Sequence, residues 1–127
     1  MARLFVVDDE WHIRERLELE LSEEGHEVIT AASGHKLINK ITVARPDLVI
    51  LDIRLVDCDG LEMLLQIRDR YPDLPVIICS AYDSYKYDRR ARAADYYVVK
   101  SYDLSQLKEK ITRALDARIP ELARAAG

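Results

Sequence analysis

The sequence contains few cysteines, no excess of basic residues and no long apolar run. The two cysteines, Cys58 and Cys79, have neither the spacing of metal ligands nor the density of a disulfide scaffold. The net charge of -4 argues against a broad basic surface, so we expect no direct binding to nucleic acid. No apolar run approaches the roughly 20 residues of a membrane span, and the N-terminus has no signal-peptide pattern. We therefore expect a cytoplasmic protein that does not associate with membranes.

The composition indicates one globular domain. Hydrophobic residues account for 49% of the 127 residues and charged residues for 33%, which is typical of a soluble folded protein. This length fits a single domain with an ordinary core. We expect Ile119 and Pro120 to break the last helix. The domain is therefore predicted over residues 1–120, followed by a short tail over residues 121–127.

Apolar runs and amphipathic segments alternate along the chain. The apolar runs predict strands at residues 4–7, 27–31, 48–51, 75–79 and 97–99. The segments between them predict helices at 11–24, after a cap at Ser33, and at 61–71, 83–94 and 103–118. Strands that alternate with helices imply parallel pairing through right-handed crossovers. We predict an α/β fold of the flavodoxin-like class, a five-stranded parallel sheet in the order 2-1-3-4-5 flanked by five helices.

Polar residues follow four of the predicted strands. Asp8 and Asp9 follow the first strand, Asp52 the third, Ser80 the fourth and Lys100 the fifth. The ends of parallel strands meet at one edge of the sheet, so these side chains are expected to converge there. Three neighbouring carboxylates repel one another and stay ionised together only if a cation compensates them. Carboxylate oxygens suit Mg²⁺, and no histidine or cysteine lies at ligand spacing to favour Zn²⁺.

A pocket of this kind suits phosphoryl transfer. Asp52 would be the nucleophile, because a carboxylate can form a covalent acyl phosphate. A metal ion and Lys100 would offset the charge of the transferred group, and Ser80 would donate to one of its oxygens. The residues alone thus favour a magnesium-dependent phosphoryl acceptor.

Five short motifs occur between residues 3 and 118, at the ends of the predicted strands. They are Val-Val-Asp8-Asp9-Glu10, Leu-Asp52-Ile-Arg-Leu, Asp59-Gly60, Ser80-Ala81 and Tyr97-Val98-Val99-Lys100. In this combination the chain resembles the receiver (REC) domain of bacterial two-component response regulators, whose fold is CheY-like. The resemblance implies a receiver domain over residues 1–120 that is not an enzyme beyond its own phosphorylation and dephosphorylation.

The resemblance also implies roles for particular residues. Asp52 would accept a phosphoryl group from a histidine kinase or a phosphotransfer protein, and Lys100 would pair with that group. Asp8, Asp9, Asp52 and the backbone carbonyl of Arg54 would hold Mg²⁺. These assignments are those of the family's motif, carried over position by position.

By the same resemblance, Ser80 and Tyr97 would form a conformational switch. The aspartyl phosphate adds negative charge and acceptor oxygens, which would draw Ser80 and its loop inward. That movement vacates space for Tyr97, which would change rotamer. A protein partner reads the change only if it binds the two arrangements differently.

The chain departs from the family pattern after the lysine. Ser101 stands where the family usually has a proline, whose peptide bond is commonly cis. A cis bond before a residue other than proline costs roughly 2.5 to 4 kcal/mol. The bond between Lys100 and Ser101 is therefore either trans with a shifted loop, or cis and strained.

Arg54 and Tyr82 occupy the positions two residues beyond Asp52 and two beyond Ser80. In the family these positions flank the path of the water that attacks the acyl phosphate. We hypothesise that this bulky pair shields the phosphoryl group and lengthens its life.

Tyrosines gather in the last third of the chain, where arginines lie among them. Six of the seven are found there: Tyr82, Tyr85, Tyr87, Tyr96, Tyr97 and Tyr102. One interpretation is an ordinary solvated helix with partly packed rings. The other is that residues 82–102 bind a downstream protein or a second copy of the chain when Asp52 is phosphorylated, since tyrosine and arginine are enriched at interfaces.

Two other functions remain open from the sequence. A phosphatase of the haloacid dehalogenase type also uses an aspartyl nucleophile with Mg²⁺, but it needs a second aspartate where this chain has Arg54. Activity on phosphate monoesters would favour that function. The chain could also be a receiver-like binding module that is never phosphorylated, although the acids, the hydroxyl and the lysine are all present.

Overall fold

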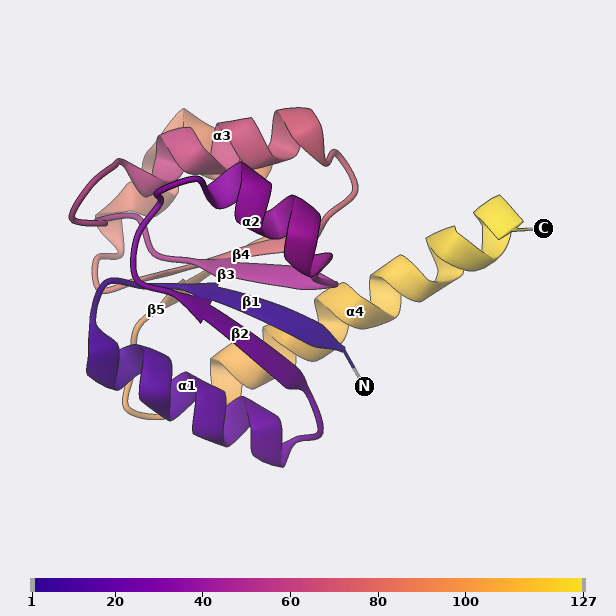
Figure 1. The fold of residues 1–127 in the computed structure, drawn as a ribbon, viewed down its shortest axis with the longest axis horizontal. Helices are drawn as coiled ribbons and strands as arrows, with labels where there is room; N and C mark the ends of the chain where they lie inside the picture. The colour runs from indigo at the N-terminus through magenta and orange to yellow at the C-terminus, as the bar shows by residue number, and fades with distance from the viewer. Residues whose placement is uncertain (1, 127) are drawn as a thin grey trace.

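The computed structural model describes residues 2–126 and forms a parallel sheet between two layers of helices (Figure 1). The strand order is β2-β1-β3-β4-β5, so the predicted order 2-1-3-4-5 is confirmed. The strands are β1 (Arg3–Val7), β2 (Glu27–Ala31), β3 (Leu48–Leu51), β4 (Val76–Ser80) and β5 (Tyr96–Val99). Every residue of β3 and β4 is buried, as expected for strands covered on both faces.

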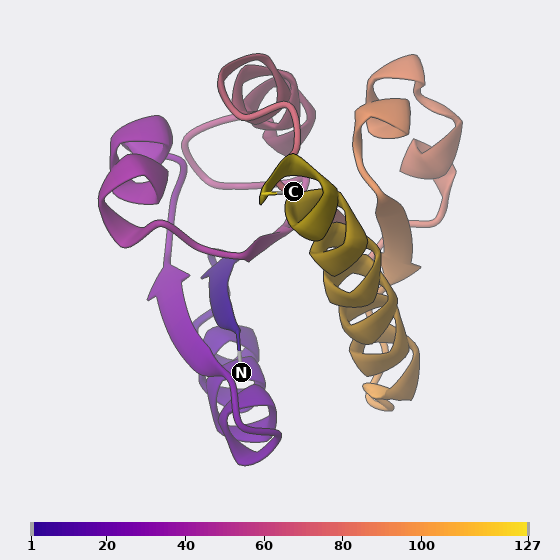
Figure 2. The same cartoon turned by 90° about the vertical axis from the view of Figure 1, so that its right-hand side faces the viewer.

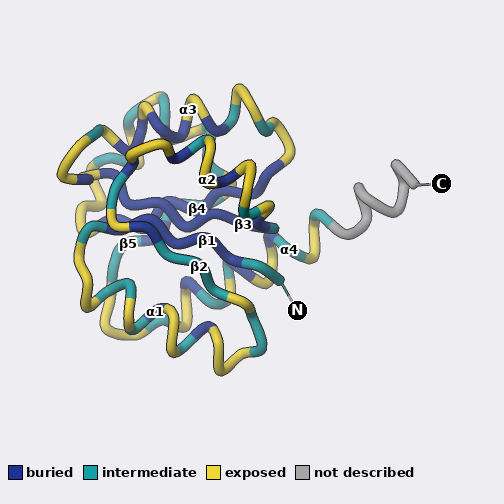
Figure 3. The backbone as a smooth tube through the Cα atoms, in the orientation of Figure 1, coloured by how far each residue is buried: buried dark blue, intermediate teal, exposed yellow. Residues whose placement is uncertain are grey.

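Four α-helices occur within residues 2–126. They are α1 (Trp11–Glu23), α2 (Leu37–Ala44), α3 (Gly60–Arg70) and α4 (Ser105–Ala126). Helices α2 and α3 cover one face of the sheet, and α1 and α4 cover the other (Figures 1 and 2). The buried side chains form two clusters, one on each face, and the solvent-facing sides of the helices are exposed (Figure 3). None of the helices in this part of the chain is both long and apolar enough to cross a bilayer.

The prediction of an α-helix over residues 83–94, the fourth of the five predicted helices, was wrong. This segment instead forms two short 3-10 helices, η1 (Ser84–Tyr87) and η2 (Arg89–Ala93). Asp88 separates them, because its backbone is extended and its carboxylate accepts a hydrogen bond from the Arg90 amide. Ala91 is the one buried residue of the segment, so no apolar stripe stabilises a regular α-helix here.

The predicted end of the last helix was also wrong. Helix α4 runs to Ala126 and passes through Ile119 and Pro120. The division into a domain over residues 1–120 and a tail over residues 121–127 stays a prediction. One proline removes a single backbone donor, and the alanines, leucine and glutamate after it are strong helix formers. The start of α4 follows the prediction, since Asp103 Oδ1 accepts a hydrogen bond from the Ser105 amide at 2.9 Å.

Ser33 does not cap α2. The N-cap residue is Lys36, whose backbone is left-handed and which makes no side-chain cap. Ser33 Oγ instead accepts a hydrogen bond from the His35 amide at 3.2 Å, inside the turn that precedes the helix. The helix therefore depends on its buried residues Leu37 and Ile41 rather than on a polar cap.

Candidate phosphoryl-acceptor site

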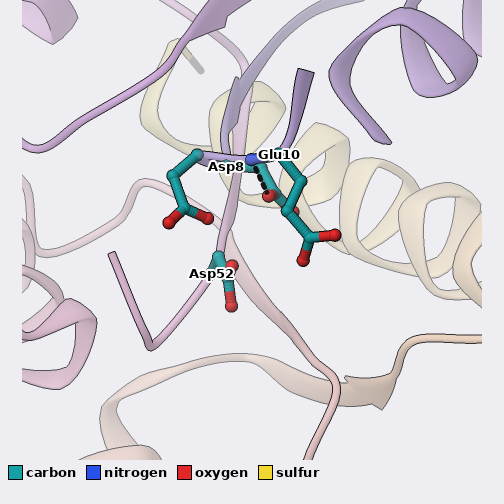
Figure 4. Close-up of side chains that lie close together, drawn as sticks. Asp8, Glu10 and Asp52 are labelled. Carbon is teal, nitrogen blue, oxygen red and sulfur yellow. Dashed lines mark hydrogen bonds between the residues drawn. The ribbon is translucent and has the colours of Figure 1, made fainter. Parts of the chain in front are cut away.

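Backbone hydrogen bonds continue past the ends of β1 and β3 and fix the first residues of the site. The Asp8 amide donates to the Ala31 carbonyl at 3.1 Å, and the Asp52 amide to the Val7 carbonyl at 3.0 Å. The Asp8 and Asp52 residues are only 3% and 5% exposed. Asp8 Oδ1 also accepts a hydrogen bond from the Glu10 amide, which brings Glu10 to the same edge (Figure 4). The two predicted acids thus lie side by side on the central strands.

The loop after β3 returns close to the site through a glycine. A Cβ atom at Gly60 would lie 2.1 Å from the backbone oxygen of Asp52 and 2.6 Å from the Cα of Ile53. The Gly60 amide donates to the Ile53 carbonyl at 2.6 Å. A residue without a side chain is therefore required for α3 to begin directly beside the end of β3.

Lys100 follows β5 and reaches across to the ends of β1 and β3. Its Nζ lies 2.8 Å from Asp8 Oδ2, 3.1 Å from Asp52 Oδ2 and 3.3 Å from Glu10 Oε1. The side chain of Lys100 is 13% exposed. The contacts with Asp52 and Glu10 are hydrogen bonds, and the contact with Asp8 is an ion pair.

Burial and charge act against each other in this pocket. Burial raises the pKa of Asp52, the charge of Lys100 lowers it and the charge of Asp8 raises it again, with a net rise above the usual value. Burial lowers the pKa of Lys100, but hydrogen bonding to Asp8 and the charges of Asp52 and Asp8 outweigh it, so that pKa is raised. Lys100 therefore stays charged, while ionised Asp52 is destabilised.

The acidic side chains of this edge fit a hard divalent cation. Asp8, Asp9, Glu10 and Asp52 each offer one oxygen, and these oxygens all lie within 4.8 Å of one another. Four carboxylates exceed the charge of one lysine, and oxygen donors without nitrogen or sulfur suit Mg²⁺. Arg54, two residues beyond Asp52, forms a single antiparallel backbone bridge with Asp59. Its carbonyl as a metal ligand stays a prediction.

A family model for the response regulator receiver domain matches residues 4–112, which is most of the chain. The chain belongs to the receiver domain family of response regulators. The resemblance seen in the five motifs is thereby confirmed, and so is the CheY-like fold, with four α-helices in place of five.

Known relatives agree with this membership. The response regulator MprA of Mycolicibacterium vanbaalenii is 35% identical over 123 residues, which cover 94% of this chain and 53% of the relative. This receiver domain therefore spans about half the length of the curated relatives it matches.

Three solved structures are particularly informative. The response regulator protein TrrA of Thermotoga maritima, in complex with Mg²⁺ and BeF, is 45% identical with a TM-score of 0.87, covering 91% of this chain and 100% of TrrA. TrrA has also been solved with the histidine kinase ThkA, at 45% identity and a TM-score of 0.85, covering 91% of this chain and 99% of that chain. A CheY-like receiver domain protein of Methanospirillum hungatei is 31% identical with a TM-score of 0.88, covering 95% and 98% of the two chains.

Ser80 and Tyr97, the predicted switch residues of this receiver domain, both contact Tyr82. Ser80 is 1% exposed, and its Oγ accepts a hydrogen bond from the Tyr82 amide at 3.1 Å. The phenol of Tyr97 donates to the backbone carbonyl of Tyr82. Partial burial raises the pKa of this phenol, so it remains a hydrogen-bond donor at neutral pH. Movement of Ser80 would therefore displace a residue that Tyr97 holds.

The structure brings Arg54 and Tyr82 together. The Arg54 guanidinium lies 5.0 Å from the centre of the Tyr82 ring, in the geometry of a cation–π contact. A T-shaped contact with Tyr85 supports the same ring, with 6.0 Å between ring centres. The two positions that were expected to flank the site are thus in direct contact.

The loop after β5 contains no cis bond. Among residues 2–126 no peptide bond is cis, so the bond between Lys100 and Ser101 is trans. The Lys100 amide donates to the Ser80 carbonyl at 2.7 Å, which fixes the lysine beside β4. Of the two alternatives left by the sequence, the trans bond is the one observed.

Glu10 and His12 lie at the site but were not predicted there. Glu10 was recognised as one of three acids after β1, but its ion pair with Lys100 joins residues 90 positions apart and cannot be inferred from spacing. His12 is exposed, and its Nε2 lies 3.2 Å from Glu10 Oε2. The acidic run after the strand was the signal that could have indicated Glu10.

Proposed function

We propose that this receiver domain accepts a phosphoryl group on Asp52. The observation that supports the proposal best is the position of Lys100 Nζ, in contact with both Asp8 and Asp52 at the edge of a buried acidic pocket. A carboxylate oxygen of Asp52 would attack the phosphorus of a phosphohistidine. A phosphorus–oxygen bond forms, the phosphorus–nitrogen bond breaks, and the imidazole leaves with the bonding electrons and takes up a proton.

The acids of the pocket are proposed to hold Mg²⁺ through Asp8, Asp9, Asp52 and the backbone carbonyl of Arg54. When bound, the ion offsets negative charge on the phosphoryl oxygens and on the carboxylates. Lys100 would donate hydrogen bonds to the transferred group, because its ammonium already lies 3.1 Å from Asp52 Oδ2. Burial excludes bulk water, so these charge interactions are stronger than they would be at the surface.

Ser80 and Tyr97 are proposed to transmit the phosphorylated state. The hydroxyl of Ser80 would turn from the Tyr82 amide toward a phosphoryl oxygen and donate to it. Tyr82 would then shift, and its carbonyl would no longer lie in place for the Tyr97 phenol. Tyr97 would be free to take a second rotamer, and a partner that distinguishes the two arrangements would read the change.

The proposed partners are proteins. TrrA binds the histidine kinase ThkA in a solved complex, and we propose a histidine kinase or a phosphotransfer protein as the donor for this chain. Residues 82–102 are proposed to bind a downstream protein or a second copy, since Tyr82, Tyr87 and Tyr102 are 48%, 78% and 90% exposed. The cytoplasmic location and the lack of direct nucleic-acid and membrane binding stay predictions.

A phosphatase of the haloacid dehalogenase type is not favoured by the site. Its second aspartate would stand at the position of Arg54, whose guanidinium lies over the Tyr82 ring. A binding module that is never phosphorylated is not favoured either, because Lys100 and the acids are arranged around Asp52.

Acetyl phosphate with Mg²⁺, followed by intact-mass measurement, tests the proposal. We expect the parent to gain the mass of one phosphoryl group, and Asp52→Asn or a sample with EDTA to gain none. A parent that gains no mass with any phosphodonor would favour the unphosphorylated module. Steady release of phosphate from monoesters would favour the phosphatase.

A further inference from the structure

Glu10 shares the ammonium group of Lys100 with the two buried aspartates. We propose that Glu10 is a positioning residue that holds Lys100 before phosphorylation and releases it to the phosphoryl group. The inference rests on the proposed phosphorylation of Asp52 and assigns to the site a residue that lies outside the proposed metal ligands and switch.

The argument begins with the number of donors. The Lys100 ammonium, which has three N–H donors, donates hydrogen bonds to Asp52 Oδ2 and Glu10 Oε1 and forms an ion pair with Asp8 Oδ2. A phosphoryl group on Asp52 adds acceptor oxygens within reach of the same nitrogen. Phosphorylation converts the Asp52 carboxylate into an acyl phosphate, so the contact of Lys100 with Asp52 passes to the phosphoryl group. A second hydrogen bond from Lys100 to that group requires the ammonium to give up Asp8 or Glu10.

Glu10 is the contact that is least costly to give up. Its side chain is 46% exposed, whereas that of Asp8 is 5% exposed. Water can solvate a released surface carboxylate, but a released buried carboxylate loses its counter-charge without gaining water. The Glu10 contact is also the longest of the three, at 3.3 Å.

The local structure leaves the Glu10 carboxylate free for this role. Glu10 is the N-cap residue of α1, yet its side chain makes no capping hydrogen bond to the helix. Its amide is held by Asp8 Oδ1 at 2.9 Å, so the backbone stays in place whichever way the side chain turns. His12 Nε2, 3.2 Å from Oε2, offers a second partner after Lys100 leaves.

Substitutions at Glu10 should therefore favour the phosphoryl-bound state. Glu10→Gln keeps the size and an acceptor oxygen but removes the charge, and a charge-assisted hydrogen bond is stronger than a neutral one. At saturating Mg²⁺ we expect beryllofluoride to bind about threefold more tightly than in the parent, the size of effect usual for a half-exposed ion pair. Glu10→Ala should show at least the same gain.

A matched control separates release of Lys100 from a general loss of negative charge. Asp83→Asn also removes one carboxylate from the loops at this edge of the sheet, but the ion-pair partner of Asp83 is Lys86, at 3.0 Å. Its affinity for beryllofluoride should equal that of the parent. Mg²⁺ affinity without beryllofluoride should not rise in Glu10→Gln, because that substitution removes negative charge from the edge of the pocket.

Calorimetric titration of the full chain with Mg²⁺ and with beryllofluoride decides between the outcomes. Tighter beryllofluoride binding in Glu10→Gln alone supports the inference. Unchanged or weaker binding in Glu10→Gln, or an equal gain in Asp83→Asn, would overturn it while the parent still accepts a phosphoryl group. A parent that neither binds beryllofluoride nor gains a phosphoryl group would overturn the proposed function and this inference together.

Discussion

Two cations in this receiver domain each contact three carboxylates, but one lies in the pocket and the other lies near the surface. The carboxylates of Lys100 belong to Asp8, Glu10 and Asp52, and those of Arg90 belong to Asp59, Glu62 and Asp88. The side chain of Lys100 is 13% exposed, and that of Arg90 is 32% exposed. Residues 52–59 connect the two clusters along the chain.

Because the two clusters differ in burial, the pKa values of their carboxylates shift in opposite directions. Burial raises the pKa of Asp52 even though Lys100 lies beside it. Hydrogen bonds from Arg90, through its side chain and its amide, lower the pKa of Asp88. The anion is thus destabilised in the pocket and stabilised near the surface. The pocket cluster carries unfavourable charge that a metal ion or a phosphoryl group can relieve, whereas the Arg90 cluster fastens η2 to the start of α3.

Removal of each cation should produce the largest contrast. Lys100→Met leaves buried Asp8 and Asp52 without a counter-charge, and we expect the free energy of unfolding to fall by about 3 kcal/mol. Arg90→Met should cause a much smaller change, because water solvates its partners. Urea denaturation of both variants and the parent measures the effect. Equal losses in the two variants would show that burial does not separate the clusters.

Removal of the Asp52 charge should raise the free energy of unfolding, whereas removal of the Lys100 charge lowers it. Because folding raises the pKa of Asp52 above its ordinary value of 3.8, ionised Asp52 opposes folding, and Asp52→Asn should stabilise the domain at pH 7. We expect a gain on the order of 1 kcal/mol, because burial and, to a lesser extent, the like charge of Asp8 disfavour the Asp52 anion.

The same gain should depend on pH in one direction. The folded state holds the Asp52 proton more tightly than the unfolded state does. The stability that this proton contributes is complete below the ordinary pKa of Asp52 and is lost as pH rises through the pKa of the folded state. The advantage of Asp52→Asn over the parent should therefore shrink as pH falls from 7 toward 4. Urea denaturation of both proteins over this range tests it, and a gain that grows toward low pH would contradict the raised pKa.

The sequence predicted the pocket cluster better than the surface cluster. Strand β3 lies at the predicted residues 48–51, because a continuous apolar run leaves few alternatives to a buried strand. The acids after it follow from parallel topology, which brings strand ends to one edge. The Arg90 cluster lies on a segment without an apolar stripe, where a composition rich in Ala, Tyr and Arg wrongly suggested an α-helix. Contacts of exposed charged side chains leave no periodic signal in the sequence.

Arg54 lies between Asp52 and Asp59 in the sequence, and its substitution tests a smaller effect, the lifetime of the phosphoryl group. Its guanidinium covers Tyr82 at 5.0 Å, and we expect the pair to slow attack of water on the acyl phosphate. Arg54→Ala and Tyr82→Ala should each lose the phosphoryl group about threefold faster, in line with one partly exposed cation–π contact. Intact-mass measurement after removal of the phosphodonor follows the decay, with Arg92→Ala as the control. Unchanged or slower loss in both variants would discard the shielding hypothesis.

Salt concentration should also distinguish the two clusters, and its effect on the melting temperature is the smallest that we expect. The Debye length falls from about 10 Å at 0.1 M salt to about 3 Å at 1 M, so exposed charges are screened first. The slight fall in melting temperature expected for Arg90→Met at low salt should disappear at high salt, while the deficit of Lys100→Met should persist. Thermal denaturation at both salt concentrations measures this. If the lower melting temperature of Arg90→Met persisted at high salt, Asp59, Glu62 and Asp88 would hold Arg90 as strongly as a buried ion pair does. The contrast between the clusters would then depend on position in the sheet rather than on solvent exposure.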